Sequence, residues 1–282
     1  MLKKLWFSLP FTGEAKPTVA VVPMGGVISS DTRPGRGLNL VAMEKTLERV
    51  FTGGPYKAVI LAINSPGGSP TQSRMLHDRI RALSKEHKVP VLSYIEDVGA
   101  SGGYMIALSG DEIFADPYAI VGSIGVISAG FGFPEAIDKL GVERRVYTAG
   151  ENKSQLDPFR PEDPEQVARL SEILSKLHTL FIEMVKRRRG ARLKGEEKDV
   201  FSGQFWVAGD AVELGLIDGT GDLRALLQAR FGKEVKLKRF DADRRPGILK
   251  LLGASHIPSQ IVDPDAMIAA MEERAVWARY GQ

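Results

Sequence analysis

The sequence predicts an α/β domain in which largely parallel strands are covered by helices. Three observations carry this prediction. Short apolar runs alternate with stretches whose apolar residues recur at helical spacing, turns that bear glycine or proline separate them, and 282 residues suffice for one large domain. The chain is 43% hydrophobic and 26% charged, which is ordinary for a globular protein.

The first half of the chain repeats a strand followed by a helix. Residues 18–23 form a continuous apolar, β-branched run, typical of a buried strand, and two glycines end it. Residues 38–51 carry apolar side chains three or four apart, which predicts a helix that stops at Gly53. By the same criteria we expect strands at 57–63 and 89–95 and a helix at 71–83.

The second half is expected to hold shorter elements around one long helix. In Pro164–Arg189 six apolar residues recur three or four apart, which predicts a helix with one buried face. Its last three residues are arginines followed by Gly190, and we interpret them as a solvated helix end rather than a phosphate or lipid patch. The remaining expected elements are strands at 112–115, 120–128, 142–148 and 216–218, and helices at 133–140, 208–214 and 222–231.

Two end segments are expected to lie outside the main domain, which we place at residues 18–240. Residues 1–17 hold two lysines and a short apolar run broken by Pro10, so we expect a flexible arm, with a weak interfacial anchor as the alternative. Residues 241–282 are expected to form a linker and a tail helix at 264–280 that packs back or meets a partner subunit. No stretch approaches the length of a transmembrane helix.

Charge and cysteine content exclude several classes of function. The 38 basic and 35 acidic residues leave a net charge of +3, which is too small to indicate nucleic-acid binding. The chain has no cysteine, which excludes disulfides, thiolate zinc sites and a cysteine nucleophile. We expect no metal ion and no cofactor, and a cytoplasmic location with membrane association left open.

Two glycine-bearing turns are the candidate sites of chemistry. Ser101 lies in VGASGGY at 98–104, between an expected strand and a helix, where small neighbours let a substrate carbonyl approach a nucleophile. The competing interpretation is a simple helix cap. Gly67 and Gly68 follow another strand, where open α/β sheets bind ligands, and their N–H groups can hold an oxyanion. The competing interpretation there is a turn that needs glycine.

No base for Ser101 is evident from the residues alone. The four histidines lie within helices, at a helix end or in the tail, and we expect surface or packing roles for them: His77, His87, His178 and His256. Lys153 follows an expected strand, between small polar residues and an apolar patch. If its amine is desolvated it can act as a base, and an ordinary loop lysine is the competing interpretation.

Four motifs, taken together and in order, resemble the signal peptide peptidase A family of serine peptidases, the protease IV and SohB type (S49). They are NSPGG at 64–68, ASGGY at 100–104, GSIGV at 122–126 and GENKS at 150–154. Ser101 lies 22 residues before Ser123 and 52 before Lys153, as in that family. The resemblance implies a ClpP/crotonase-like fold of repeated strand–helix units, in a single compact domain with a C-terminal helical tail.

Carried over residue by residue, the resemblance implies a serine–lysine site. Ser101 is the nucleophile, Lys153 is the base and later the acid, and Ser123 holds the lysine amine. The N–H groups of Gly67 or Gly68, with that of Gly102, make the oxyanion hole. The implied activity is that of an endopeptidase that cleaves remnant signal peptides or unfolded, membrane-derived segments, with a preference for small apolar side chains. The implied assembly is a homo-oligomeric ring in which neighbouring protomers supply the serine and the lysine.

Two rival functions remain open at this point. A crotonase-like acyl-CoA enzyme reuses the same oxyanion architecture, but the glycine turns carry no evident acid–base carboxylates and Lys153 has no role in it. An inactive scaffold that binds membrane-associated partners is the other rival. The presence of Ser101, Ser123 and Lys153 together argues against that scaffold.

Overall fold

The computed structural model describes residues 16–31, 37–150, 152–241 and 264–282, and it confirms the expected α/β class. Eight strands form one sheet in the order β6-β5-β3-β2-β1-β8, with β4 paired to β3 and β7 paired to β4. Every pairing is parallel except that of β5 with β6. The expected N-terminal arm and linker lie almost wholly outside the described residues, so the proposed domain division stays a prediction.

The strands and helices have the following bounds. The strands are β1 (Thr18–Gly25), β2 (Val59–Ser65), β3 (Val91–Ala100), β4 (Glu112–Ala115), β5 (Ile120–Gly122), β6 (Phe205–Val207), β7 (Gly219–Thr220) and β8 (Lys236–Arg239). The helices are α1 (Leu40–Thr52), α2 (Pro70–His87), α3 (Gly102–Ala107), α4 (Pro134–Lys139), α5 (Pro164–Arg189), α6 (Glu197–Val200), α7 (Ala208–Glu213), α8 (Leu223–Phe231) and α10 (Pro264–Ala278). A 3-10 turn, Gly190–Arg192, follows α5.

Alternation along the central strands produces two apolar cores, one on each face of the sheet. Val22, Leu61 and Ile95 face the larger core, which side chains of α1, α2, α3 and the C-terminal half of α5 complete. Residues next to them in the strands, such as Ile60 and Tyr94, face a smaller core under α8. The central strands are therefore buried on both sides, as their continuous apolar runs predict.

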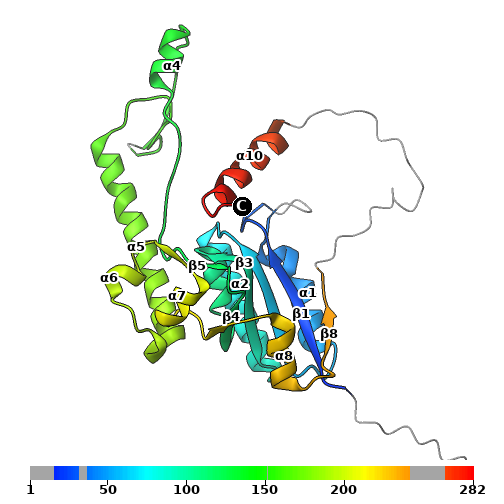
Figure 1. The fold of residues 1–282 in the computed structure, drawn as a ribbon. Coiled ribbons are helices and arrows are strands. Elements are labelled where there is room, and N and C mark those ends of the chain that lie inside the picture. The colour runs from blue at the N-terminus through cyan, green and yellow to red at the C-terminus, as the bar shows by residue number, and fades with distance from the viewer. Residues whose placement is uncertain (1–15, 32–36, 151, 242–263) are drawn as a thin grey trace, which may run out of the picture.

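An arm extends from this body between β5 and the middle of α5 (Figure 1). Of the two helices expected there, α5 has the predicted bounds and α4 lies within the predicted 133–140. The strand expected at 142–148 is wrong, because the segment forms no ladder. The strand expected at 120–128 ends at Gly122, where Gly122 and Ser123 take positive φ values of 112° and 51° and turn the chain out of the sheet.

The single buried face expected of α5 is correct only for its C-terminal half. Phe181 and Met184 of this face are buried, whereas Val167 and Leu177 are exposed. The apolar stripe continues along the helix, but the sheet beneath it does not (Figure 1). Helical period predicts which residues share a face, and the length of the neighbouring element decides how much of that face is covered.

The solvated helix end expected after α5 is correct only for Arg187, which is exposed, whereas Arg188 is half-buried and Arg189 is buried. Arg189 is 3% exposed and donates to both carboxylate oxygens of Asp218, at 2.8 and 3.0 Å. Arg188 donates to the carbonyl oxygens of Leu108 and Gly110, just after α3. These bonds tie α5 to the body. Among the described residues, no helix combines the length and apolar character needed to cross a bilayer.

Candidate active site

Ser101 lies at the carboxyl end of β3 in an unusual backbone conformation. Its φ and ψ are 51° and −119°, a region that costs free energy for a residue other than glycine. Its N–H donates to the carbonyl oxygen of Gly122 at 2.8 Å, while its side chain makes no capping hydrogen bond to α3. The helix-cap interpretation of Ser101 is therefore wrong, and its hydroxyl is available to a substrate.

The glycine turn after β2 packs directly against Ser101. A Cβ placed on Gly67 would lie 2.9 Å from the Ser101 Cβ and 2.8 Å from the Gly102 nitrogen, so only glycine fits there. The Gly67 N–H donates weakly to Ser65 Oγ, at 3.3 Å. Within the described residues, the N–H groups of Gly68 and Gly102 donate no hydrogen bond. Two unused donors therefore flank Ser101, as an oxyanion hole requires.

Ser123 lies on the turn after β5, beside Ser101 and the glycine turn. It also has a positive φ, 51°, and its N–H donates to the carbonyl oxygen of Gln204 at 2.7 Å. The hydroxyl of Tyr280, just past α10, donates to Ser123 Oγ at 3.3 Å, and the Tyr280 ring packs edge-on against Phe205. The carboxyl ends of β2, β3 and β5, which are neighbours in the sheet, thus bring both glycines and both serines together.

A cleft of about 830 Å³ opens over these residues. Its apolar wall comes from α3 and α5, through Met105, Phe181 and Met184, and the C-terminal segment contributes Val276 and Tyr280. No Asp or Glu is among the described residues that line it. The cleft therefore offers apolar contacts, serine hydroxyls, backbone N–H groups and the cationic side chains of Arg74 and Arg279.

Lys153 does not line the cleft of its own protomer. It is an exposed residue of the arm, in the turns between α4 and α5, where its backbone N–H donates to the carbonyl of Gly150 at 3.2 Å. The structure therefore brings Ser101, Ser123 and the glycines together and leaves Lys153 apart. Across the part of the chain that is described, no three His, Asp or Glu side chains gather as a metal site would need.

The histidines occupy different environments. His77 is buried, burial lowers its pKa below the ordinary 6.5, and its Nε2 has no hydrogen-bond partner among the described residues. His87 stacks on Phe51, and His256 lies outside the described residues. His178 lines the cleft, with Nε2 2.9 Å from the carbonyl oxygen of Ile124. Sequence reasoning missed this position, although its spacing from buried Phe181 and Val185 places it on the inward face of α5.

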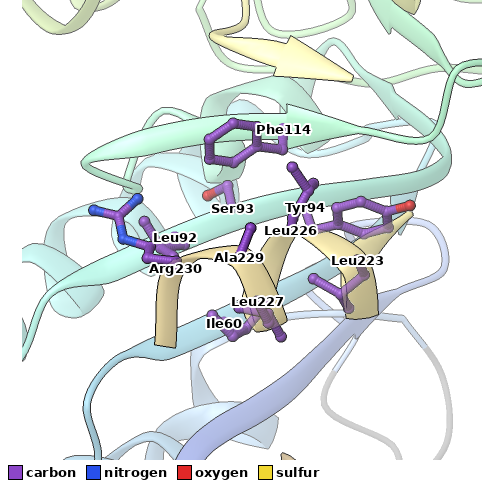
Figure 2. Close-up of a pocket in the computed structure, with 10 residues that line it drawn as sticks. All are labelled: Ile60, Leu92, Ser93, Tyr94, Phe114, Leu223, Leu226, Leu227, Ala229 and Arg230. Carbon is purple, nitrogen blue, oxygen red and sulfur yellow. The ribbon is translucent and has the colours of Figure 1, made fainter. Parts of the chain in front are cut away.

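A second cavity, of about 310 Å³, lies between α8 and the sheet (Figure 2). Its polar groups are already engaged. Ser93 donates to the carbonyl of Ala107, Tyr94 to that of Gly221, and Arg230 pairs with Glu112 at 2.6 Å. What remains is apolar carbon from residues such as Leu226 and Phe114, without a group that would orient a reacting ligand.

Comparison with known proteins gives one family match. The model described as "Peptidase family S49" matches residues 83–238. A protein named serine protease SPPA, chloroplastic, from Arabidopsis thaliana is 29% identical over 242 residues, which are 84% of this chain and 35% of that protein. Protease 4 from Haemophilus influenzae is 32% identical over 206 residues, which are 72% of this chain and 32% of that protein.

A relative with higher sequence identity is named as an antiporter and not as a protease. The Na(+)/H(+) antiporter NhaA of Brucella abortus is 49% identical over 265 residues, which are 91% of this chain and 36% of that protein. Nearly two thirds of the Brucella protein lies outside the match, so its name describes a longer molecule. The chain spans about a third of the length of these curated relatives.

Proposed function

The chain belongs to peptidase family S49, and from this premise we propose that it is a serine peptidase that cleaves peptides through an acyl-enzyme. The observation that carries the proposal is the surroundings of Ser101. Its hydroxyl is uncapped, its backbone is held in a costly conformation, and the unused N–H groups of Gly68 and Gly102 lie beside it.

In the proposed reaction, Ser101 Oγ attacks the carbonyl carbon of the scissile peptide bond and gives its proton to the neutral amine of Lys153. The N–H groups of Gly68 and Gly102 hold the negative oxygen that forms. The C–N bond then breaks, and the lysine returns its proton to the leaving amine. A water molecule, deprotonated by the same lysine, hydrolyses the ester and restores the serine.

Lys153 is proposed to come from a neighbouring protomer. Its exposed place on the arm, away from its own cleft, supports this arrangement. Large apolar side chains on the same arm, among them Phe131, Leu140 and Tyr147, are exposed as well, which is typical of a surface that a partner covers. Head-to-tail contacts of this kind form a ring when the rotation between neighbours closes, and we propose such a homo-oligomeric ring.

Ser123 is proposed to hold the incoming lysine amine with its hydroxyl. The Tyr280 hydroxyl now donates to Ser123 Oγ, so this contact is replaced when the lysine arrives. The apolar wall of Met105, Phe181 and Met184 supports a peptide substrate with apolar side chains, such as a remnant signal peptide or an unfolded, membrane-derived segment.

The test is hydrolysis of a fluorogenic apolar peptide by the full chain and by Ser101→Ala, with labelling by a fluorophosphonate probe alongside. We expect the variant to lose at least about 1,000-fold in kcat and all labelling, while circular dichroism and oligomeric state are unchanged. Undiminished cleavage by purified Ser101→Ala would overturn the proposal.

No observation favours the acyl-CoA enzyme or the inactive scaffold. An acid–base enzyme acting on acyl-CoA needs a carboxylate near the oxyanion hole, and the described cleft residues include none. A scaffold does not require unused N–H donors beside an uncapped serine. Labelling of Ser101 by the probe separates the scaffold from the peptidase, and binding of a CoA thioester in a thermal-shift assay would revive the acyl-CoA enzyme.

A further inference from the structure

His178 lies where α5 passes from the body into the arm. Toward the C-terminus of the helix, Phe181 and Val185 are buried in the main core. Toward its N-terminus, Ile173 and Leu177 are exposed. The half-buried imidazole lines the cleft together with Ser101 and Ser123. It is therefore placed to connect the helix to the catalytic end of the sheet.

One hydrogen bond makes this connection. His178 Nε2 lies 2.9 Å from the carbonyl oxygen of Ile124, the residue after Ser123. A carbonyl oxygen only accepts, so Nε2 carries a proton and donates. Both the neutral ring with its proton on Nε2 and the charged ring supply this donor. Ile124 itself is fully buried.

The turn at residues 122–125 needs such support because Ser123 adopts a positive φ without being a glycine. Its other restraints come from elsewhere in the fold. The Ser123 N–H donates to Gln204, and the carbonyl of Gly122 accepts from the N–H of Ser101. A continuous path of bonds thus runs from His178 through the turn to the backbone of Ser101.

We propose that His178 is a positioning residue of the active site: it holds the turn at residues 122–125 so that the Ser123 hydroxyl faces the place of the lysine amine. This inference rests on the proposed function, which assigns Ser123 its role. His178 acts through the backbone of Ile124. Without its N–H, the turn relaxes and the Ser123 hydroxyl is less often oriented for proton transfer, while the apolar walls that bind peptide are unchanged.

The test compares His178→Asn with His178→Gln. The two side chains carry the same amide, but glutamine is one methylene longer and places its NH₂ near the position of Nε2, whereas asparagine falls short. We expect Asn to lower kcat on the order of tenfold with KM within about twofold, and Gln to restore most of kcat. Thr179→Ala, an exposed neighbour bonded only to Ser175 of its own helix, is the control and keeps its activity.

A double-mutant cycle with Ser123→Ala distinguishes positioning from general destabilisation. If His178 acts through the Ser123 hydroxyl, His178→Asn has little further effect on kcat once that hydroxyl is gone, a change of less than about twofold. Losses that multiply in the double variant would overturn the inference, as would equal activities of the Asn and Gln variants.

Failure of this inference and failure of the proposed function give different results. A fully active His178→Asn beside an inactive Ser101→Ala removes only the positioning role. An active Ser101→Ala removes the function itself. Thermal unfolding and oligomeric state are measured for every variant. If His178→Asn is poorly folded, His178→Phe, which keeps a ring but has no donor, takes its place beside His178→Gln. A loss of kcat in Phe that Gln does not share supports the role, and equal kcat in the two variants overturns it.

Discussion

The body around Ser101 and the arm that carries Lys153 use similar apolar residues in opposite ways. In the body Leu61 is 0% exposed, and Ile63 and Leu76 are equally buried between the sheet and its helices. In the arm Phe131 is 82% exposed and Leu140 76%. The comparison teaches that an apolar stripe indicates a surface that can be covered, and that the body covers its own stripes while the arm leaves its apolar side chains exposed.

Helix α5 has a C-terminal half that the body covers and an N-terminal half that is exposed in the arm. Its C-terminal half is held by buried Phe181 and Met184, by the Arg189–Asp218 pair and by the two bonds from Arg188. Its N-terminal half leads back to the turns that hold Lys153. The helix therefore connects the body that holds Ser101 to the arm that holds Lys153.

The largest effect is expected when the intact serine and the intact lysine are supplied by different chains. Ser101→Ala and Lys153→Ala should each lose at least about 1,000-fold in peptide hydrolysis. When the two inactive proteins are dissociated, mixed in equal amounts and reassembled, sites that pair an intact serine with an intact lysine return. Random mixing predicts about a quarter of wild-type activity. A mixture as inactive as its components would place serine and lysine of one site on the same chain.

The next effect contrasts the stability of the body with that of the arm. Leu61→Ala leaves a cavity in the closed core and should cost about 2–5 kcal/mol of unfolding free energy. Leu140→Ala, at an exposed position of the arm, should change it by less than about 0.5 kcal/mol. Urea unfolding of dissociated protein checks both values, and equal losses would mean that the arm is buried within one protomer.

A smaller, pH-dependent effect is expected at the anchor of α5. Burial alone raises the pKa of Asp218, but hydrogen bonds from Arg189 and from the Ile113 N–H outweigh it and hold the pKa below the ordinary 3.8. A carboxyl with a lowered folded-state pKa contributes stability above its unfolded pKa and loses that contribution as the pH falls through the folded value. Asp218→Asn should therefore cost about 1–3 kcal/mol at pH 7.

Thermal unfolding measured between pH 7 and pH 3 tests how the stability contributed by Asp218 depends on pH. The difference between wild type and Asp218→Asn should shrink as the pH drops below about 4, because the wild-type carboxyl becomes protonated. Arg189→Lys keeps a positive charge but loses the paired hydrogen bonds. Its unfolding temperature at pH 7 should therefore lie between those of wild type and Asp218→Asn. A difference that stays constant across this pH range would show that the carboxylate charge contributes nothing.

The smallest effect is expected from a single apolar residue on the arm surface. Phe131→Ser removes an exposed ring, so the unfolding free energy of the protomer should change by less than about 0.5 kcal/mol. Assembly, measured by analytical ultracentrifugation, should weaken by about tenfold in dissociation constant, with activity falling in parallel at low protein concentration. Unchanged assembly would remove Phe131 from the proposed interface.

Much of the body was predictable because local pattern and local environment agree there. The continuous apolar runs indicated β1, β2 and β3, the capped apolar spacing indicated α5 to its bounds, and the turn at Ser101 followed from small residues after a strand. The glycine turns and both serines converge because parallel strands end at one edge of a sheet, which is a consequence of fold class alone.

Other elements depended on neighbours that no local pattern reveals. The exposed edge strand β8, KLKR, has little apolar signal, and β6 is only three residues long. Residues 142–148 have a strand-like composition, yet they lie where no strand is available to pair with them. A strand exists only when its backbone groups find a partner, and that partner is remote in sequence.

By itself, the sequence determined the fold class and the family, and it singled out Ser101 as the candidate nucleophile, because each depends on residue types at short, ordered spacings. Only the tertiary structure decided that Lys153 stands outside the cleft of its own chain, that Arg189 is a buried anchor and that His178 reaches the Ser123 turn. The physical reason is that burial and hydrogen bonding are properties of surfaces that meet, and a helix does not specify along its own length where its covering surface ends.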